Sequence, residues 1–205
     1  MIRTVFVLEA ITWNSKAHES YSVFPIVGEF AKVSGLKTFH QTFSDAKSFR
    51  HWVRIFDQSK SPKPKLLFIA CHGEKKWLKG FQTKIEFSKV SLACRRASNF
   101  ENVHFATCGF GSERNLSMIL NHCPNLKWVS GYARNVDWVE SMLFDILFMA
   151  RMVDIEKPFK GISFQGRVRN LLSENLTLAE RLGFRFHYRH GESLKSISSL
   201  DIIDS

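Results

Sequence analysis

The sequence predicts an α/β fold built on a mostly parallel sheet with helices on both faces. Apolar runs of strand length alternate along the chain with segments of helical period. Several of these runs are almost continuously apolar, as in strands that are covered on both sides. Neither an internal repeat nor a shift in composition divides the 205 residues. We therefore expect one domain over residues 1–205, in which about the last 14 residues form a flexible tail.

Six segments have the composition and pattern of strands. TVFVLEA and LLFIACH are the buried type, whereas KTFHQTF and FRFHYRH alternate like more exposed strands. In chain order, the predicted strands are 4–10, 37–43, 66–72, 102–108, 126–132 and 184–190.

The segments between them have helical period and recognisable ends. Gly35 suits a C-cap, Asp45 lies near the start of an amphipathic segment, and Pro124 stops another. The predicted helices are 22–35, 45–58, 113–123, 137–153 and 166–183, the last with a break, and a short helix before residue 98.

The composition is that of a globular chain. With 44% hydrophobic and 23% charged residues the chain is not disordered, and nineteen phenylalanines predict a phenylalanine-rich core. No apolar run approaches the roughly 20 residues of a membrane-spanning helix. The N-terminal segment lacks a signal-peptide cleavage pattern, so we expect a cytoplasmic protein. The four cysteines are too few and too scattered for a disulfide framework and are expected to be reduced.

A formal net charge of +10 suggests an anionic partner. Nucleic acid, an acidic nucleotide or an acidic protein would each suit such a field. The cations are scattered, and no motif has the spacing of a base-reading element. A basic, solvated surface without any partner accounts for the charge equally well.

A histidine and a cysteine stand at the ends of two consecutive predicted strands. LLFIACHGE ends its strand at His72, and VHFATCGFGS ends the next at Cys108. Sites in parallel sheets form beyond the carboxyl ends of strands, and consecutive strands tend to be neighbours, so we expect both side chains at one edge. An imidazole beside a thiol can generate a thiolate nucleophile and protonate a leaving amine. Gly73 and Gly109 let a substrate carbonyl approach backbone N–H groups that would form an oxyanion hole.

Cys71 precedes His72, so on a strand its side chain points to the opposite face, where it is expected to be a small buried residue. A zinc site made of cysteines and histidines is the main rival, but the chain has no C-x-x-C pair. The expected chemistry uses no metal and no organic cofactor.

The order of these segments resembles the caspase-like (clan CD) cysteine peptidases, and most of all their compact prokaryotic CHAT-type branch. LLFIACHGE, VHFATCGFGS and WVSGYARNVDWVESMLFDILF follow one another as in that family, and the resemblance covers residues 2–190. It implies a three-layer caspase/haemoglobinase-like fold whose sheet has about six strands, the last antiparallel. It also implies a protein or peptide substrate and a regulated role in prokaryotic immunity or cell death, with a partner or nucleotide-type ligand as activator.

Carried over by position, the resemblance makes His72 the general base and Cys108 the nucleophile. Gly73 and the backbone of Cys108 match the oxyanion hole. The chain lacks the acidic interdomain linker of animal caspases and their Gln-Ala-Cys-Arg-Gly signature. A mature two-subunit caspase is therefore not expected, and aspartate specificity does not follow.

The segment GYARNVDW matches the loop that lines the family's first substrate pocket. Arg134 would bind an acidic P1 side chain, Asp137 a basic one, and Tyr132 or Trp138 would wall an apolar pocket. Asp137 also has a purely structural explanation, since an acidic residue in the first turn of a helix is stabilised by the helix dipole. These alternatives stay open on the sequence.

The sequence thus predicts a cysteine endopeptidase that acts through a His72–Cys108 dyad and an acyl-enzyme. The alternative is a catalytically silent caspase-like module that binds a nucleotide, a nucleic acid or an acidic protein through its basic surface. A third hypothesis is an acyl-transfer hydrolase that acts on small thioesters.

Overall fold

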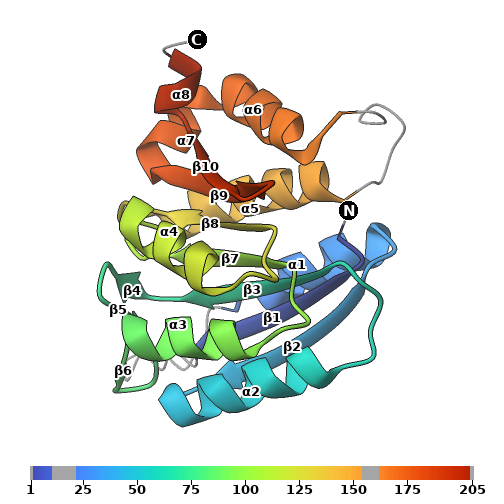
Figure 1. The fold of residues 1–205 in the computed structure, drawn as a ribbon, viewed down its shortest axis with the longest axis vertical. Helices are drawn as coiled ribbons and strands as arrows, with labels where there is room; N and C mark the ends of the chain where they lie inside the picture. Colours follow the sequence, from blue (N-terminus) through green and yellow to red (C-terminus); the bar gives the residue numbers. More distant parts are fainter. Residues whose placement is uncertain (1, 11–21, 154–161, 204–205) are drawn as a thin grey trace.

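The main sheet of the computed structural model has seven strands (Figure 1). The structure describes residues 2–10, 22–153 and 162–203. The strands are β1 (Thr4–Ala10), β2 (Lys37–Phe43), β3 (Lys65–Cys71), β7 (Asn102–Thr107), β8 (Trp128–Tyr132), β9 (Phe184–His190) and β10 (Ser193–Ser198). They lie in the order β10-β9-β8-β7-β3-β1-β2.

The strands from β2 to β8 are all parallel, whereas β9 runs antiparallel to β8 and β10 antiparallel to β9. The α/β prediction is confirmed: the sheet is mostly parallel, and the strand at 184–190 is antiparallel. The order also makes β3 and β7 direct neighbours, as consecutive strands tend to be.

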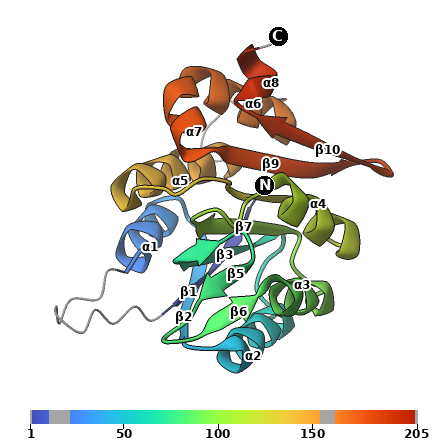
Figure 2. The same cartoon turned by 90° about the vertical axis from the view of Figure 1, so that its left-hand side faces the viewer.

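Helices cover both faces of the sheet (Figure 2). The α1–α5 face carries α1 (Phe24–Val33), α5 (Trp138–Met152), α6 (Phe164–Glu174) and α7 (Leu176–Leu182). The α2–α3 face carries α2 (Ala46–Gln58), α3 (Phe87–Arg96) and α4 (Glu113–His122). The short helix α8 (Leu200–Ile203) ends the described chain.

The sheet divides the hydrophobic core into two clusters, one under each helical layer. Along β3 the even-numbered apolar residues belong to the α1–α5 cluster and the odd-numbered ones to the α2–α3 cluster. The same alternation continues along β7. It follows from the two-residue period of a strand, and it determines which face each strand-end residue meets.

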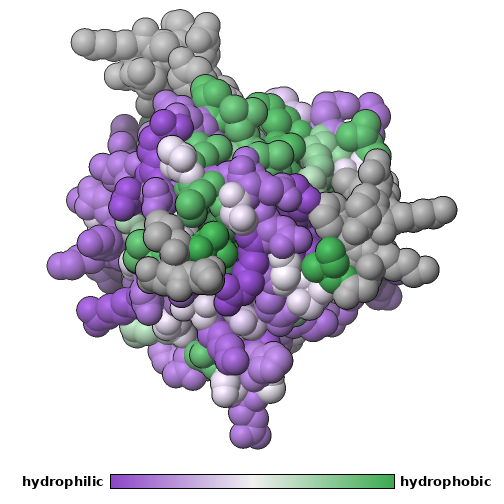
Figure 3. All heavy atoms as spheres, turned by 90° about the horizontal axis from the view of Figure 1, so that it is seen from above, coloured by the Kyte–Doolittle hydropathy of each residue, from purple (hydrophilic) through white to green (hydrophobic). Residues whose placement is uncertain are grey.

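The helix α5 is apolar on two sides. Phe144 and Phe148 are fully buried in the α1–α5 cluster, whereas Val139, Leu143 and Leu147 are 56%, 59% and 39% exposed. Residues four apart share one side of a helix, so these three form an exposed apolar stripe. Viewed from above, hydrophobic side chains gather in one region of a mostly hydrophilic surface (Figure 3). Among the described residues, no helix is both long and apolar enough to cross a membrane.

A small antiparallel sheet follows β3, where the sequence suggests only loop. It consists of β4 (Gly73–Glu74), β5 (Trp77–Lys79) and β6 (Lys84–Glu86). Strands of two or three residues are too short to show a periodic pattern. Gly80 lets this sheet approach the end of β2 closely, because a Cβ at this position would lie only 2.2 Å from the carbonyl oxygen of Ser44.

The expected flexible tail contains a strand and a helical turn. Ser193–Ser198 pair with β9 as β10, and α8 follows. Only Ile197 of this strand is buried, so the segment lacks the apolar alternation that would have indicated a strand. Pairing with β9 supplies the hydrogen bonds that hold it in place.

His187 of β9 is buried beneath α4. Its side chain is 3% exposed, and its Nδ1 lies 3.2 Å from the hydroxyl oxygen of Ser117. Burial lowers the pKa of His187 to about 4, despite the opposing influence of Glu113. A histidine that stays neutral in the folded state but protonates in the unfolded state weakens the fold as pH falls.

We predict that His187 makes folding pH-sensitive between about pH 6.5 and pH 4. Above this window the histidine is neutral in both states; within it only the unfolded chain takes up a proton, and below it both states are protonated. The two pKa values correspond to a loss of about 3 kcal/mol. Urea unfolding at pH 7 and pH 4 should show this loss in the wild type and a smaller loss in His187→Gln. Equal losses in both proteins would contradict the assignment.

Candidate active site

The strand ends that carry His72 and Cys108 lie side by side. The last register pair of β3 and β7 joins Cys71 to Thr107, so His72 and Cys108 are the next residues of two adjacent parallel strands. The carbonyl oxygen of Cys108 lies 3.3 Å from the position of a Cβ at Gly73. The two segments are therefore in contact along their backbones.

Strand alternation places His72 and Cys108 on the same face of the sheet. Cys71 packs against the α2–α3 cluster, so the residue after it turns toward the α1–α5 face. Cys108 does the same, because its sulfur contacts Val136, which packs against the α1–α5 cluster. His72 is exposed and Cys108 is partly buried, so the imidazole meets solvent while the thiol is sheltered.

The thiol of Cys108 rests against the backbone that follows β8. The N–H of Val136 donates to the sulfur at 3.4 Å, and the carbonyl oxygen of Val136 lies 3.8 Å from it. An N–H donor is suited to a sulfur that carries negative charge during a reaction. Because Val136 acts through its backbone, its side chain gave no signal in the sequence.

Glycines hold the turn after Cys108 against the end of β8. Gly109 has φ +65° and donates its N–H to the carbonyl of Arg134 at 2.9 Å. Gly111 donates to the carbonyl of Tyr132 at 2.8 Å. A Cβ at Gly111 would lie 2.3 Å from the backbone of Gly131, so no other residue fits there.

Asn115 of α4 joins the two halves of the site. Its side-chain amide donates to the carbonyl of Lys75, in the turn after Gly73, at 2.8 Å, and to that of Phe110, in the turn after Cys108, at 2.9 Å. Asn115 is only 6% exposed, so both bonds are sheltered from water. Nothing in the sequence distinguishes this asparagine from any other polar residue on a helix.

The N–H of Gly73 points away from the neighbouring β5. Lys79 donates its N–H to the carbonyl of His72 at 2.8 Å, which makes His72 and Lys79 a hydrogen-bonded pair of the antiparallel ladder. The next pair, Gly73 and Leu78, is then of the non-hydrogen-bonded kind, whose N–H groups point outward. The Gly73 N–H is thus directed away from the small sheet, beside Cys108.

Of the other three cysteines, Cys94 and Cys123 are buried, whereas Cys71 is partly exposed, as Cys108 is. All four are free. Burial raises the pKa of Cys71 and of Cys94, and it raises the pKa of Cys123 to about 11. These three thiols stay protonated near neutral pH, and protonated thiols are poor nucleophiles.

The four specificity candidates at the end of β8 and after it have different environments. The carboxylate of Asp137 accepts the N–H groups of Val139 and Glu140, at 2.9 and 3.0 Å, and so caps α5. This supports the structural explanation of Asp137. Arg134 is exposed, and no ion pair links it to a carboxylate within the described ranges.

The structure does not support Tyr132 as the wall of an open pocket. Its side chain is 0% exposed, and its hydroxyl donates to the carbonyl of Ser141 at 3.1 Å and to the carboxylate of Asp145. Burial and the neighbouring carboxylate hold the pKa of Tyr132 well above its usual value. The tyrosine thus anchors the end of β8 to α5 and has no surface left for a substrate. Trp138, by contrast, is 42% exposed.

The fold of the chain has counterparts among solved protein structures. Sequence comparison adds nothing, because the chain matches no known protein-family model and no curated protein. Among solved structures, the chain is similar to a secreted C11 cysteine protease from Bacteroides thetaiotaomicron, in complex with an irreversible peptide inhibitor. The match covers 98% of this chain and 67% of that chain, with a TM-score of 0.53 and 10% identity. At this identity the likeness establishes the fold alone.

We predict that Cys108 is the first thiol to be alkylated in the folded protein. Iodoacetamide at pH 7.5, followed by peptide mass mapping, should modify Cys108 before the other three thiols, whose raised pKa values keep them protonated. In Cys108→Ala the early modification should disappear while the slow labelling of the others continues. Early labelling of Cys71 would show that the two neighbouring cysteines have been assigned to the wrong roles.

Proposed function

We propose that the protein is a cysteine endopeptidase in which His72 and Cys108 form the catalytic dyad. The observation that carries the proposal is the register of β3 and β7, which puts both residues one step beyond paired strand ends and on one face. The likeness in fold to a cysteine protease bound to a peptide inhibitor supports a peptide substrate.

In the proposed reaction the His72 imidazole takes the thiol proton of Cys108, and the thiolate attacks the scissile carbonyl. The outward N–H of Gly73, together with the backbone N–H of Cys108, stabilises the oxyanion. His72 then gives its proton to the leaving amine, and water activated by His72 hydrolyses the acyl-enzyme. The donation of the Val136 N–H to the sulfur keeps the thiol at this edge of the sheet.

We propose Arg134 as the group that selects the P1 side chain, which would then be acidic. Tyr132 is buried, and the Asp137 carboxylate already caps α5. Arg134 adjoins the nucleophile, because its carbonyl accepts the N–H of Gly109, and its guanidinium is suited to a carboxylate. Trp138 then borders the pocket as an exposed apolar side chain.

We also propose that the protein belongs to the CHAT-type branch and acts as a regulated effector in prokaryotic immunity or cell death. Both proposals rest on the order of the His-Gly, Cys-Gly and Gly-Tyr segments along the chain. Fold likeness supports neither by itself, because one fold serves many functions.

Cleavage of a proteome-derived peptide library tests the dyad. Wild-type protein should cut after acidic residues, whereas Cys108→Ala and His72→Ala should each lose about 10³-fold or more of kcat/KM, as when a catalytic triad loses a member. Arg134→Ala should retain a nucleophilic Cys108 but lose the preference for acidic P1 residues.

Cys71→Ala is the matched control for the first variant, since it removes the adjacent thiol on the other face. It should cleave at close to the wild-type rate. Cleavage that persists in Cys108→Ala would refute the dyad, and a preference unaltered in Arg134→Ala would refute the P1 proposal only.

Asn115 connects the turns after Gly73 and Cys108 through its side-chain amide, so we expect it to position the two catalytic residues. Asn115→Ala should lower kcat/KM by about 10- to 100-fold, because small displacements of catalytic groups have large kinetic costs. Asn125 provides the control, since its amide also donates to two carbonyls, those of Ala97 and Phe100, away from the site.

Both asparagine variants should lose a similar amount of stability in urea, about 1–3 kcal/mol each. Only Asn115→Ala should lose activity. If Asn125→Ala loses as much activity, the effect is a general one of stability and Asn115 has no positioning role.

The silent binding module is the second candidate, and one observation favours it: a basic groove between α2 and α3, which Arg50, Arg54 and Arg96 line. A wild-type protein that cleaves no peptide and yet binds an anionic ligand there would support this alternative. Hydrolysis of small thioesters without peptide cleavage would instead support an acyl-transfer hydrolase.

A further inference from the structure

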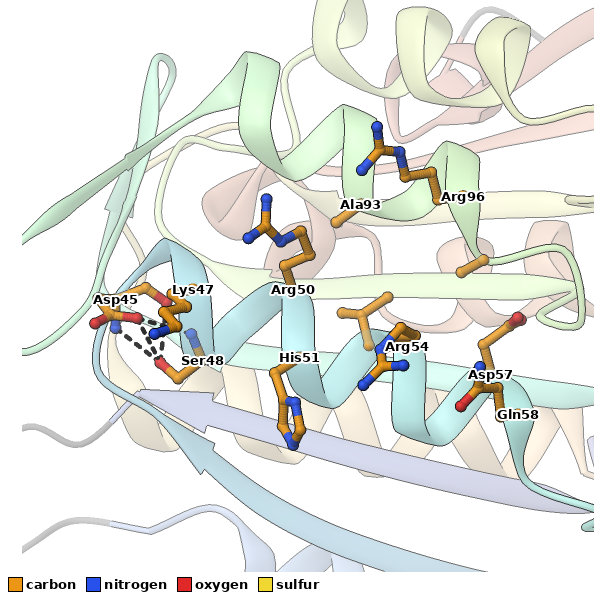
Figure 4. A pocket seen from close by; sticks show the side chains of 12 residues that line it. Asp45, Lys47, Ser48, Arg50, His51, Arg54, Asp57, Gln58, Ala93 and Arg96 are labelled. Carbon is orange, nitrogen blue, oxygen red and sulfur yellow. Dashed lines mark hydrogen bonds between the residues drawn. The ribbon is translucent and has the colours of Figure 1, made fainter.

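A groove of about 750 Å³ lies between α2 and α3, on the face of the sheet opposite to Cys108 (Figure 4). It is open to solvent along the two helices. Its volume is within the range of sites that hold small organic ligands, about 300–1,000 Å³. The sheet separates it from the His72–Cys108 site, so it is a different site.

Arginines from both helices line the groove. Arg50 and Arg54 come from α2 and Arg96 from α3, and Figure 4 shows Arg50 extending from α2 toward the helix that carries Arg96. All three are exposed. Within the part of the chain that the structure describes, none of them forms an ion pair with a carboxylate.

The two carboxylates of the groove are engaged elsewhere. Asp45 caps α2 by accepting the N–H of Ser48 at 2.7 Å, and this bond lowers the pKa of its carboxyl. Asp57 is 9% exposed and accepts the N–H of Asn99 at 2.6 Å. Neither carboxylate pairs with an arginine, and the four cations that line the groove outnumber its two carboxylates, so the groove keeps a net positive charge.

The spacing of the cations also favours a bound anion. Arg50 and Arg54 are four residues apart on one side of α2, where like charges repel. Lys47 continues the same side one turn earlier. A row of cations on adjacent turns suits a ligand with more than one phosphate, and the guanidinium group matches phosphate in a two-pronged geometry.

The floor of the groove is apolar and made of small side chains. Val53 of α2 and Ala93 and Ala97 at the α3 side are almost fully buried and line the groove. Because these side chains are small, the groove keeps a width between the two helices that a flat ring can enter, and arginine planes stack on such rings. Inorganic phosphate alone would leave most of the groove's volume of about 750 Å³ unfilled.

We propose that the groove between α2 and α3 binds a nucleotide that carries two or more phosphates. Arg50, Arg54 and Arg96 hold the phosphates, and the base occupies the rest of the groove between α2 and α3. The site is independent of the proposed peptidase chemistry, since it lies on the other face of the sheet and shares no residue with it.

Titration calorimetry with ATP, GTP, CTP and UTP, each in low and high salt, tests the proposal. At least one should bind in low salt, and more weakly in high salt, as phosphate contacts require. The double variant Arg50→Ala/Arg96→Ala should weaken that binding at least tenfold. The double variant Arg95→Ala/Arg114→Ala removes the same charge from exposed positions outside the groove and should bind like the wild type.

Three results would overturn the proposal. The first is no binding of any of the four nucleotides by folded wild-type protein. The second is equal weakening in both double variants, which would mean that only net charge matters. The third is binding of tripolyphosphate or of an octaglutamate peptide as tight as that of the best nucleotide, which would mean that the groove recognises anions without a base. Peptide cleavage does not enter this test, so the proposed peptidase function stands or falls separately.

Discussion

The site depends on one pairing, the parallel register that joins Cys71 of β3 to Thr107 of β7. If β7 were paired with β3 one residue out of register, Cys108 would no longer lie beside His72. If either strand ended one residue earlier or later, its end residue would point to the other face of the sheet. The pairing is secured on both sides: strand residues alternate into two buried clusters, so a slip would expose apolar side chains to water. The packing of the core thus maintains the geometry of the strand ends.

A buried polar network fixes the next strand and the helix behind it. His104 of β7 makes 2.8 Å hydrogen bonds to the Ser130 hydroxyl and to the Asp145 carboxylate, which also accepts from Tyr132. All four side chains are at most 1% exposed. The grouping of serine, histidine and aspartate looks like a catalytic triad, but no substrate can reach it. Its effect is to orient β8 and α5, and hence the loop between them that contacts Cys108.

The two faces of the sheet have different chemistry. On the α1–α5 face the strand ends carry a thiol, an imidazole and the outward N–H of Gly73. On the α2–α3 face, the helices present arginines whose carboxylate neighbours are used as a helix cap and a loop anchor. Part of the net charge of +10 is therefore concentrated along one groove, where the cations outnumber the carboxylates. Chain connectivity links the faces, since the segment after His72 leads through β4, β5 and β6 into α3.

The sequence by itself determined the sheet class, the strands that end at His72 and Cys108, and the opposite orientation of Cys71. These follow from local periodicity, which needs no knowledge of distant residues. The sequence also indicated why Asp137 stands at the start of α5. Tertiary structure alone decided that Tyr132 is buried, that Val136 and Asn115 hold the site, that residues 193–198 form β10, and that arginines of α2 and α3 share a groove. Each of these depends on contacts between segments far apart in the chain, and a side chain's burial or partner is a property of that packing.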